Sequence, residues 1–137
     1  AYGLMQLLPS TAAEQAGKAG LPVSTPRLLS DPVYNLTLGS GYFARLRSGF
    51  GGSHVLAVAA YNAGGGNVRR FIGINGDPRQ PDVDMIDWIE SIPFSETRNY
   101  VQRVLENAVV YDLLHPTTAV MPTSNRLSAY LGKKTPG

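Results

Sequence analysis

Residues 57–66 of the chain read AVAAYNAGGG. Small apolar residues let a helix pack closely against its neighbours, and glycine is suited to end it. Between the apolar run and the three glycines stand Tyr61 and Asn62. Two interpretations are open: either this is simply a packed helix that ends in glycine, or the helix end also holds Tyr61 and Asn62 as polar tips at the lip of a cleft.

The composition limits the class of protein. The chain has 137 residues, of which 43% are hydrophobic and 16% charged, and this indicates one ordered globular domain. Its net charge of +2 and the lack of a long basic run argue against a nucleic-acid partner. There is no cysteine, so disulfides and thiolate metal sites are excluded, and with two histidines a zinc site is not expected. No apolar run reaches the roughly 18 residues of a membrane span.

The pattern along the chain is helical. Glycine and proline breaks separate the helical segments, and no convincing alternation of period two marks a strand. Thr11 and Glu14 have capping-box spacing for a first helix, Asp31-Pro32 can open a second and Ser53 a third. The expected helices lie between residue 11 and the glycines at 17–20, from 32 to about 47, from 54 to 62, over 67–72, and from 95 or 96 to 114.

The last of these helices is the longest. Its apolar spacing predicts a buried face made of Val101, Val104, Leu105, Ala108 and Tyr111. Residues 73–82 are expected to form an irregular polar loop. We therefore predict a mainly α fold, with a single domain over residues 1–115 and a loosely held C-terminal tail over residues 116–137.

Three short segments read together are more specific than any one alone. They are GLMQLLPSTA at residues 3–12, AAYNAG at 59–64 and IPFSETRNYV at 92–101. In this order they resemble three motifs of the bacterial lytic murein transglycosylases, above all the catalytic domain of the soluble enzyme. Asp31-Pro32, Asn35-Leu36 and Gly39 resemble that family's intervening helix. The resemblance spans residues 3 to about 114 and implies a lysozyme-like helical fold of the goose type.

The resemblance implies cleavage, without water, of the bond between N-acetylmuramic acid and N-acetylglucosamine in peptidoglycan. One Glu of the family protonates the glycosidic oxygen and then takes the proton of the muramyl 6-hydroxyl, which closes a 1,6-anhydro ring. The substrate's acetamido group can replace the second carboxylate of ordinary glycosidases, and the internal hydroxyl gains from proximity. This chemistry needs no cofactor. Hydrolysis of the lysozyme type and a non-catalytic, peptidoglycan-binding or scaffold role are the alternatives.

The family's acid lies in a Glu-Ser motif shortly before Gly-Leu-Met-Gln, whereas this chain begins almost at that Gly. It opens Ala1-Tyr2-Gly3 without an initiator Met, so we expect an N-terminally incomplete domain whose general acid is not among these residues. Glu90-Ser91 spells the same dipeptide but stands after the Tyr-Asn motif, in the wrong order. We interpret Glu90 as a surface or capping carboxylate.

The remaining site residues are carried over from the resemblance position by position. Tyr61 matches a cleft tyrosine that orients the acid, and Glu96 a second cleft carboxylate, although a core tyrosine and a helix N-terminal Glu are the structural alternatives. Asn62 either binds sugar or ties its loop to the helix end. Gln6 either binds sugar or satisfies loop backbone, and Leu8 is a cleft wall or a core residue. The predicted supporting catalytic residues are Tyr61 and Glu96, and the predicted sugar contacts are Gln6, Leu8, Ala60 and Asn62.

The implied partners and location follow from the substrate class. Peptidoglycan glycan strands would be the partner, which places the protein in the periplasm or cell envelope. Membrane association would come only from regions outside this chain, and the sequence does not indicate an oligomeric state. Trp88, the single tryptophan, can stack on a sugar face, but it is interpreted as an anchor in the core.

Overall fold

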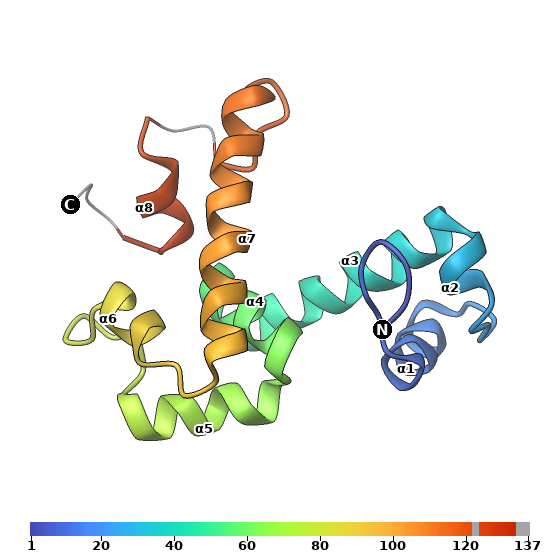
Figure 1. The fold of residues 1–137 in the computed structure, drawn as a ribbon, viewed down its shortest axis with the longest axis horizontal. Helices are drawn as coiled ribbons and strands as arrows, with labels where there is room; N and C mark the ends of the chain where they lie inside the picture. Colours follow the sequence, from blue (N-terminus) through green and yellow to red (C-terminus); the bar gives the residue numbers. More distant parts are fainter. Residues whose placement is uncertain (122–123, 134–137) are drawn as a thin grey trace. The chain divides into compact units, whose positions relative to one another are not determined.

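The computed structural model describes residues 1–121 and 124–133 and is mainly α (Figure 1). Within these residues the only pairing of the β type is an isolated bridge between Tyr2 and Leu7. The chain divides into two compact units, an N-terminal unit (Ala1–Leu46) and a C-terminal unit (Arg47–Gly137). The helices are α1 (Pro9–Ala19), α2 (Arg27–Ser30), α3 (Pro32–Gly49), α4 (His54–Ala63), α5 (Gly65–Asn75), α6 (Met85–Glu90), α7 (Ser95–Leu114) and α8 (Arg126–Tyr130).

In the N-terminal unit, a buried amide fixes the loop that precedes α1. Asn35 of α3 is 1% exposed, and its Nδ2 donates to the carbonyls of Tyr2 (2.9 Å) and Leu28 (3.0 Å). Its Oδ1 accepts from the Met5 amide at 2.8 Å. Gly3 lies so close that an added Cβ would come within 2.2 Å of Asn35 Nδ2. The conformation of residues 2–7 is therefore set by one side chain on a helix some thirty residues later.

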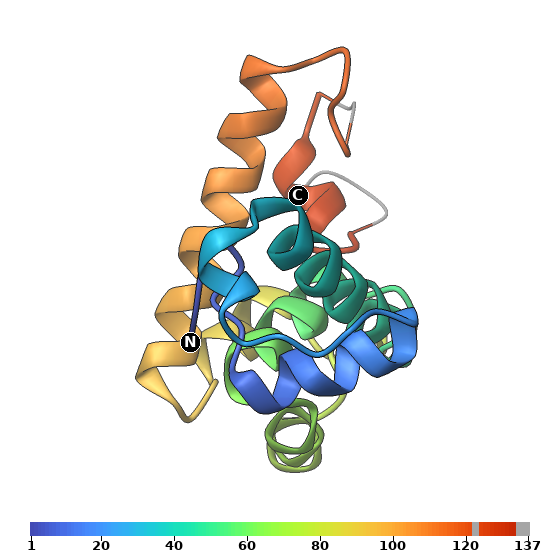
Figure 2. The same cartoon turned by 90° about the vertical axis from the view of Figure 1, so that its right-hand side faces the viewer.

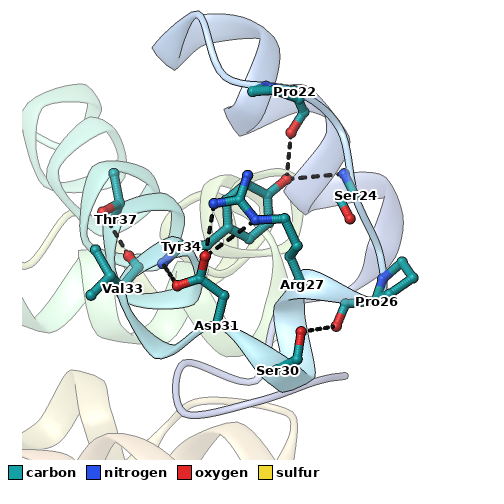
Figure 3. A network of polar contacts seen from close by, with 9 residues as sticks. All are labelled: Pro22, Ser24, Pro26, Arg27, Ser30, Asp31, Val33, Tyr34 and Thr37. Atoms are coloured by element: carbon teal, nitrogen blue, oxygen red, sulfur yellow. Dashed lines mark hydrogen bonds and ion pairs between the residues drawn. The ribbon is translucent and has the colours of Figure 1, made fainter.

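A second network holds the segment that leads into α3 (Figure 3). Asp31 Oδ1 accepts from the Tyr34 amide at 3.0 Å, which caps α3 as its sequence predicts, and Oδ2 accepts from Arg27 at 2.7 Å. The Arg27 hydrogen bond holds the pKa of the Asp31 carboxyl below its usual range. The Tyr34 hydroxyl donates to the Pro22 carbonyl (2.8 Å) and accepts from the Ser24 amide (3.1 Å). The loop between α1 and α2 is thus fastened to α3.

In the C-terminal unit, α4 is the central helix and packs against α5 and α7. Every residue from Val55 to Ala60 is at most 5% exposed, so this part of the helix is apolar and buried on all its sides. The small residues in it permit close approach of the neighbouring helices. Ser53 caps α4 by accepting from the Leu56 amide at 3.3 Å. The predicted helix over residues 54–62 and its cap are confirmed.

The junction between α4 and α5 depends on Gly64. This residue ends α4 and starts α5 with φ 87° and ψ 144°, a conformation that is essentially restricted to glycine. Its amide donates to the Ala60 carbonyl at 2.8 Å, and Asn67 Nδ2 donates to the Ala63 carbonyl at 2.8 Å. The chain can therefore turn sharply just after Tyr61 and Asn62 while its backbone groups remain paired.

The predicted helices from 32 and from 95 are also confirmed, and the remaining boundaries differ. Pro9 occupies the first turn of α1, so Thr11 lies inside the helix and its capping box with Glu14 does not form. Helix α5 extends over 65–75, because Gly64 alone has the non-helical conformation and the glycines that follow it belong to the helix. Tyr111 is exposed and stacks on His115 with ring centroids 4.3 Å apart, so its predicted burial is wrong. The sequence did not predict α2, α6 or α8.

The region after residue 115 is held to α7 in its described part. Helix α8 packs against α7 (Figures 1 and 2). The buried Asp112 carboxylate accepts from the amides of Val120 (3.0 Å) and Met121 (3.1 Å) and from the Tyr130 hydroxyl (2.6 Å). This differs from the loosely held tail expected there, because a carboxylate inside α7 supplies the anchor. The part of that prediction that concerns residues 122–123 and 134–137 lies outside the described residues, and the predicted domain limit at 115 stays a prediction.

None of the described helices is both long and apolar enough to cross a membrane.

Candidate functional site

The six predicted site residues are divided between the two units. Gln6 and Leu8 belong to the N-terminal unit, next to the loop fixed by Asn35. The others belong to the C-terminal unit, where α4 carries Ala60, Tyr61 and Asn62, and the first turn of α7 carries Glu96.

Gln6 has an unusual backbone conformation. Its φ of 50° makes it the one non-glycine residue with positive φ in the described part of the chain. Such conformations carry strain and cluster at functional sites. Its side chain is exposed, and Nε2 donates to the Gly3 carbonyl at 2.8 Å, which is the loop-satisfying contact considered for it. This contact uses the Nε2 atom and not Oε1. The predicted contact of Gln6 with sugar stays a prediction.

Leu8 lies at the start of α1 and is 55% exposed, so it is not a core residue. Its exposure fits the predicted cleft wall. Ala60 is 0% exposed. The sugar contact expected of Ala60 stays a prediction, and its buried side chain leaves only backbone groups to make it. Tyr61, one residue later, is half-buried.

A pocket of about 450 Å³ joins the end of α4 to the start of α7. Asn62 and Glu96, both predicted site residues, line it. Thr97, which is 1% exposed, donates its hydroxyl proton to Asn62 Oδ1 at 2.7 Å. This hydrogen bond ties the Tyr-Asn helix end to the Glu-containing turn, so the second and third motifs meet in space. The complete lining is Asn62, Ala63, Pro93, Phe94, Ser95, Glu96 and Thr97.

The rim of this pocket carries one carboxylate and one aromatic ring. Glu96 is exposed, and no described residue forms a hydrogen bond or an ion pair with its carboxylate. Its place in the first turn of α7 is favourable for a negative charge. Phe94 packs edge-on against the buried Phe71, with ring centroids 5.1 Å apart. The pocket therefore combines an amide, a carboxylate and an apolar wall, which is a set suited to a polar ligand with small apolar groups.

The carboxyl groups with displaced pKa values are all unsuited to act as a general acid. A general acid near neutral pH needs a raised pKa. Hydrogen bonds from basic side chains, a tyrosine hydroxyl or backbone amides instead lower the pKa of Glu14, Asp31, Asp77, Asp84 and Asp112. None of these five carboxyls is a candidate for the proton donor.

The other residues considered have structural contacts. Glu90 is exposed and accepts from Gln102 Nε2 at 2.9 Å, in agreement with its interpretation as a surface carboxylate. Trp88 is 1% exposed and donates from Nε1 to the Gly76 carbonyl at 3.0 Å, so it anchors the core. Arg98 donates to the carbonyls of Glu90 and Ile92. In the described part of the chain, no three His, Asp or Glu side chains converge in a way that could hold a metal ion.

Comparison with known proteins assigns the family. The model of the transglycosylase SLT domain matches residues 1–82, which is more than half of the chain. The chain belongs to the transglycosylase SLT family. A second model, the soluble lytic transglycosylase helical domain, matches residues 91–115. The soluble lytic murein transglycosylase of Escherichia coli is 41% identical over 112 residues, which cover 81% of this chain and 17% of that protein.

Two solved structures are similar to this SLT-family chain. A structure of an inactive Glu-to-Gln mutant of the lytic transglycosylase Slt from Pseudomonas aeruginosa is 45% identical, with a TM-score of 0.72 over 82% of this chain and 18% of that one. The 70-kDa soluble lytic transglycosylase from Escherichia coli is 36% identical, with a TM-score of 0.76 over 90% of this chain and 20% of that one. The chain thus spans about a fifth of these relatives, and the predicted lysozyme-like helical fold is confirmed.

Sequence reasoning missed three contributions to the site. Asn35 holds the loop that carries Gln6, and Thr97 is the hydrogen-bond partner of Asn62. Both contacts are long-range hydrogen bonds, which motif spacing does not reveal. Both residues lie inside the matched motifs, and this was the available signal. The exposure of Phe94 at the pocket could not be inferred, because an aromatic residue before a helix is as well suited to a core.

Proposed function

We propose that this chain is part of a lytic transglycosylase that cleaves the MurNAc–GlcNAc bond of peptidoglycan and leaves 1,6-anhydromuramyl ends. The observation that carries the proposal is its membership of the transglycosylase SLT family, together with 41% identity to a soluble lytic murein transglycosylase. The partner is then the peptidoglycan glycan strand, and the site of action is the periplasm or cell envelope.

The proposed reaction requires a general acid, and the five carboxyls with a lowered pKa are unsuited to that role. We propose that a Glu-Ser segment ahead of Gly3 supplies it, in the order that the family motifs imply. The relative from Pseudomonas aeruginosa is inactive as a Glu-to-Gln mutant, which supports an essential glutamate in that protein. After bond cleavage the same carboxylate takes the proton of the muramyl 6-hydroxyl, and that oxygen closes the ring on C1. Water is not consumed, because an internal nucleophile has a high effective concentration.

The residues of this chain have supporting roles in the proposal. Tyr61 orients the acid or stabilises developing charge, and Glu96 positions the sugar or raises the pKa of the acid through like charge. Asn62, Gln6 and Leu8 contact sugar. These roles agree with the exposed Glu96 carboxylate, the exposed Leu8 and the position of Asn62 in the pocket.

Digestion of purified murein by the complete protein tests the proposal. Mass spectrometry should find anhydromuramyl ends in the released fragments. Reducing muramic ends would instead identify a lysozyme-type hydrolase, and release of no fragment despite tight binding to murein would identify a binding or scaffold protein.

Replacement of Tyr61 by Phe tests the assignment of the tyrosine. The half-buried ring is retained and only the hydroxyl is lost. We expect turnover to fall at least about tenfold, the scale of one lost hydrogen bond to a charged group, with little change in melting temperature. An unchanged rate of murein cleavage would remove Tyr61 from the mechanism.

A further inference from the structure

We propose that Thr97 is a positioning residue, and that the pocket between α4 and α7 binds the acetamido group of an N-acetylated sugar through Asn62. This inference rests on the proposed function, because it assumes a glycan ligand. In this proposal the bound group is the acetamido group, the Asn62 amide donates the hydrogen bond, and Thr97 acts without touching the ligand.

The first step is the orientation of the Asn62 amide. A primary amide carries one acceptor oxygen and one NH2 group with two donors, and either end can face a ligand. Here Oδ1 is occupied by the Thr97 hydroxyl at 2.7 Å. Thr97 is 1% exposed at the start of a twenty-residue helix, so this donor is held in place. In the structure the amide therefore stands with Oδ1 toward Thr97 and with Nδ2 left for another partner.

The second step is what this orientation leaves available. Asn62 is half-buried and lines the pocket, and no described residue accepts a hydrogen bond from its Nδ2. The Nδ2 atom is not fully buried, so water or a ligand in the pocket can reach it. The pocket therefore offers a donor and selects a ligand that brings an acceptor, such as a carbonyl oxygen.

The third step is the remaining lining of the pocket. Phe94 is 43% exposed and is held edge-on by Phe71. It supplies an apolar surface in the same pocket as the amide, and the Glu96 carboxylate supplies an acceptor. An acetamido group has a carbonyl oxygen, a methyl group and an N–H. These three parts match the Asn62 donor, the Phe94 ring and the Glu96 acceptor.

The pocket has the capacity for such a group. Its volume of about 450 Å³ exceeds that of a single acetamido group and leaves room for part of a sugar ring. All seven lining residues belong to the C-terminal unit.

The test uses the complete transglycosylase and two isosteric variants of Thr97. The probes are a β-1,4-linked tetramer of N-acetylglucosamine and the same tetramer with free amines, and binding is measured by calorimetry. Thr97→Val keeps the shape and removes the hydroxyl, so the amide can rotate. We expect it to lower affinity for the acetylated tetramer about tenfold and to reduce the preference over the free amine. Thr97→Ser keeps the hydroxyl and should retain the wild-type preference.

A variant of Asn62 separates orientation from folding. Asn62→Asp keeps an acceptor for Thr97 and replaces the donor by a second acceptor. Its affinity for the neutral, acetylated tetramer should fall about tenfold or more, with a melting temperature close to that of the wild type. This measurement decides the proposal even if Thr97→Val fails to fold.

Some results would overturn the proposal. Unchanged affinity of Asn62→Asp for the acetylated tetramer would exclude Asn62 as the donor, and equal behaviour of Thr97→Ser and Thr97→Val would exclude orientation by the hydroxyl. If the wild type cleaves murein, these results contradict this inference alone. If the wild type neither cleaves murein nor binds either tetramer, the proposed function fails and the acetamido pocket fails with it.

Discussion

Gly64 allows the structure to be tested at one backbone position. It joins α4 to α5 with φ 87° and ψ 144°, and an added Cβ would meet no other heavy atom within 4 Å. The cost of Gly64→Ala is therefore a backbone cost with no steric contribution from neighbouring side chains. Forcing a residue other than glycine into such a region costs about 1–3 kcal/mol. We take about 2 kcal/mol as the expected loss in the free energy of unfolding.

The same triplet of glycines supplies the control. Gly66 lies inside α5, has no positive φ and also has no heavy atom within 4 Å of an added Cβ. Gly66→Ala should stabilise the helix by up to about 1 kcal/mol, because alanine loses less conformational entropy on folding. The two variants add the same methyl group two residues apart, and only the backbone conformation differs.

Thermal unfolding measures the difference. A cooperative unit of about this chain's length has an unfolding entropy near 0.29 kcal/mol/K, so a loss of about 2 kcal/mol lowers the melting temperature by about 7 °C. Gly64→Ala should melt lower than the wild type, and Gly66→Ala should melt at the same temperature or slightly higher. Equal melting temperatures of the two variants would refute the proposed strain at Gly64 and with it the account of the α4–α5 junction.

Two further predictions concern stability. Gly39→Ala should destabilise the N-terminal unit, because its Cβ would lie 2.4 Å from Met5 side-chain atoms. Gly17→Ala on α1 has open space around the added Cβ and should stabilise the unit. Denaturant titration of both variants checks this, and similar midpoints would contradict it. Acid should release the anchor of α8: the Tyr130 hydroxyl bond and the two amides lower the pKa of Asp112 from 3.8, so its stabilising effect is complete above that value and is lost as the pH falls through the lower folded pKa. Asp112→Asn should therefore show a weaker acid dependence between pH 5 and pH 2 in thermal melts, and an unaltered pH profile would exclude this role.

The sequence by itself was sufficient to predict the main helices of this protein and its family. The cap at Asp31 located the start of α3, and the cap at Ser53 and the glycines after Ala63 located the two ends of α4, because these signals act on the nearest turn of backbone. The ordered motifs around Gln6, Tyr61 and Glu96 led to the family, since residue type and order are properties of the chain alone. Short helices such as α6 were beyond this reasoning, because six residues carry too little periodic signal.

Only the tertiary structure decided which motif residues meet, and in what role. Asn35 holds the loop that carries Gln6 through a bond to Met5, 30 residues away in the sequence. Thr97 donates to the Asn62 amide, 35 residues away. Ala60 and Tyr61 are neighbours in AVAAYNAGGG, yet one is fully buried and the other half-buried. These differences arise because hydrogen bonds and burial depend on distance in space, and residues far apart in the chain set them through packing.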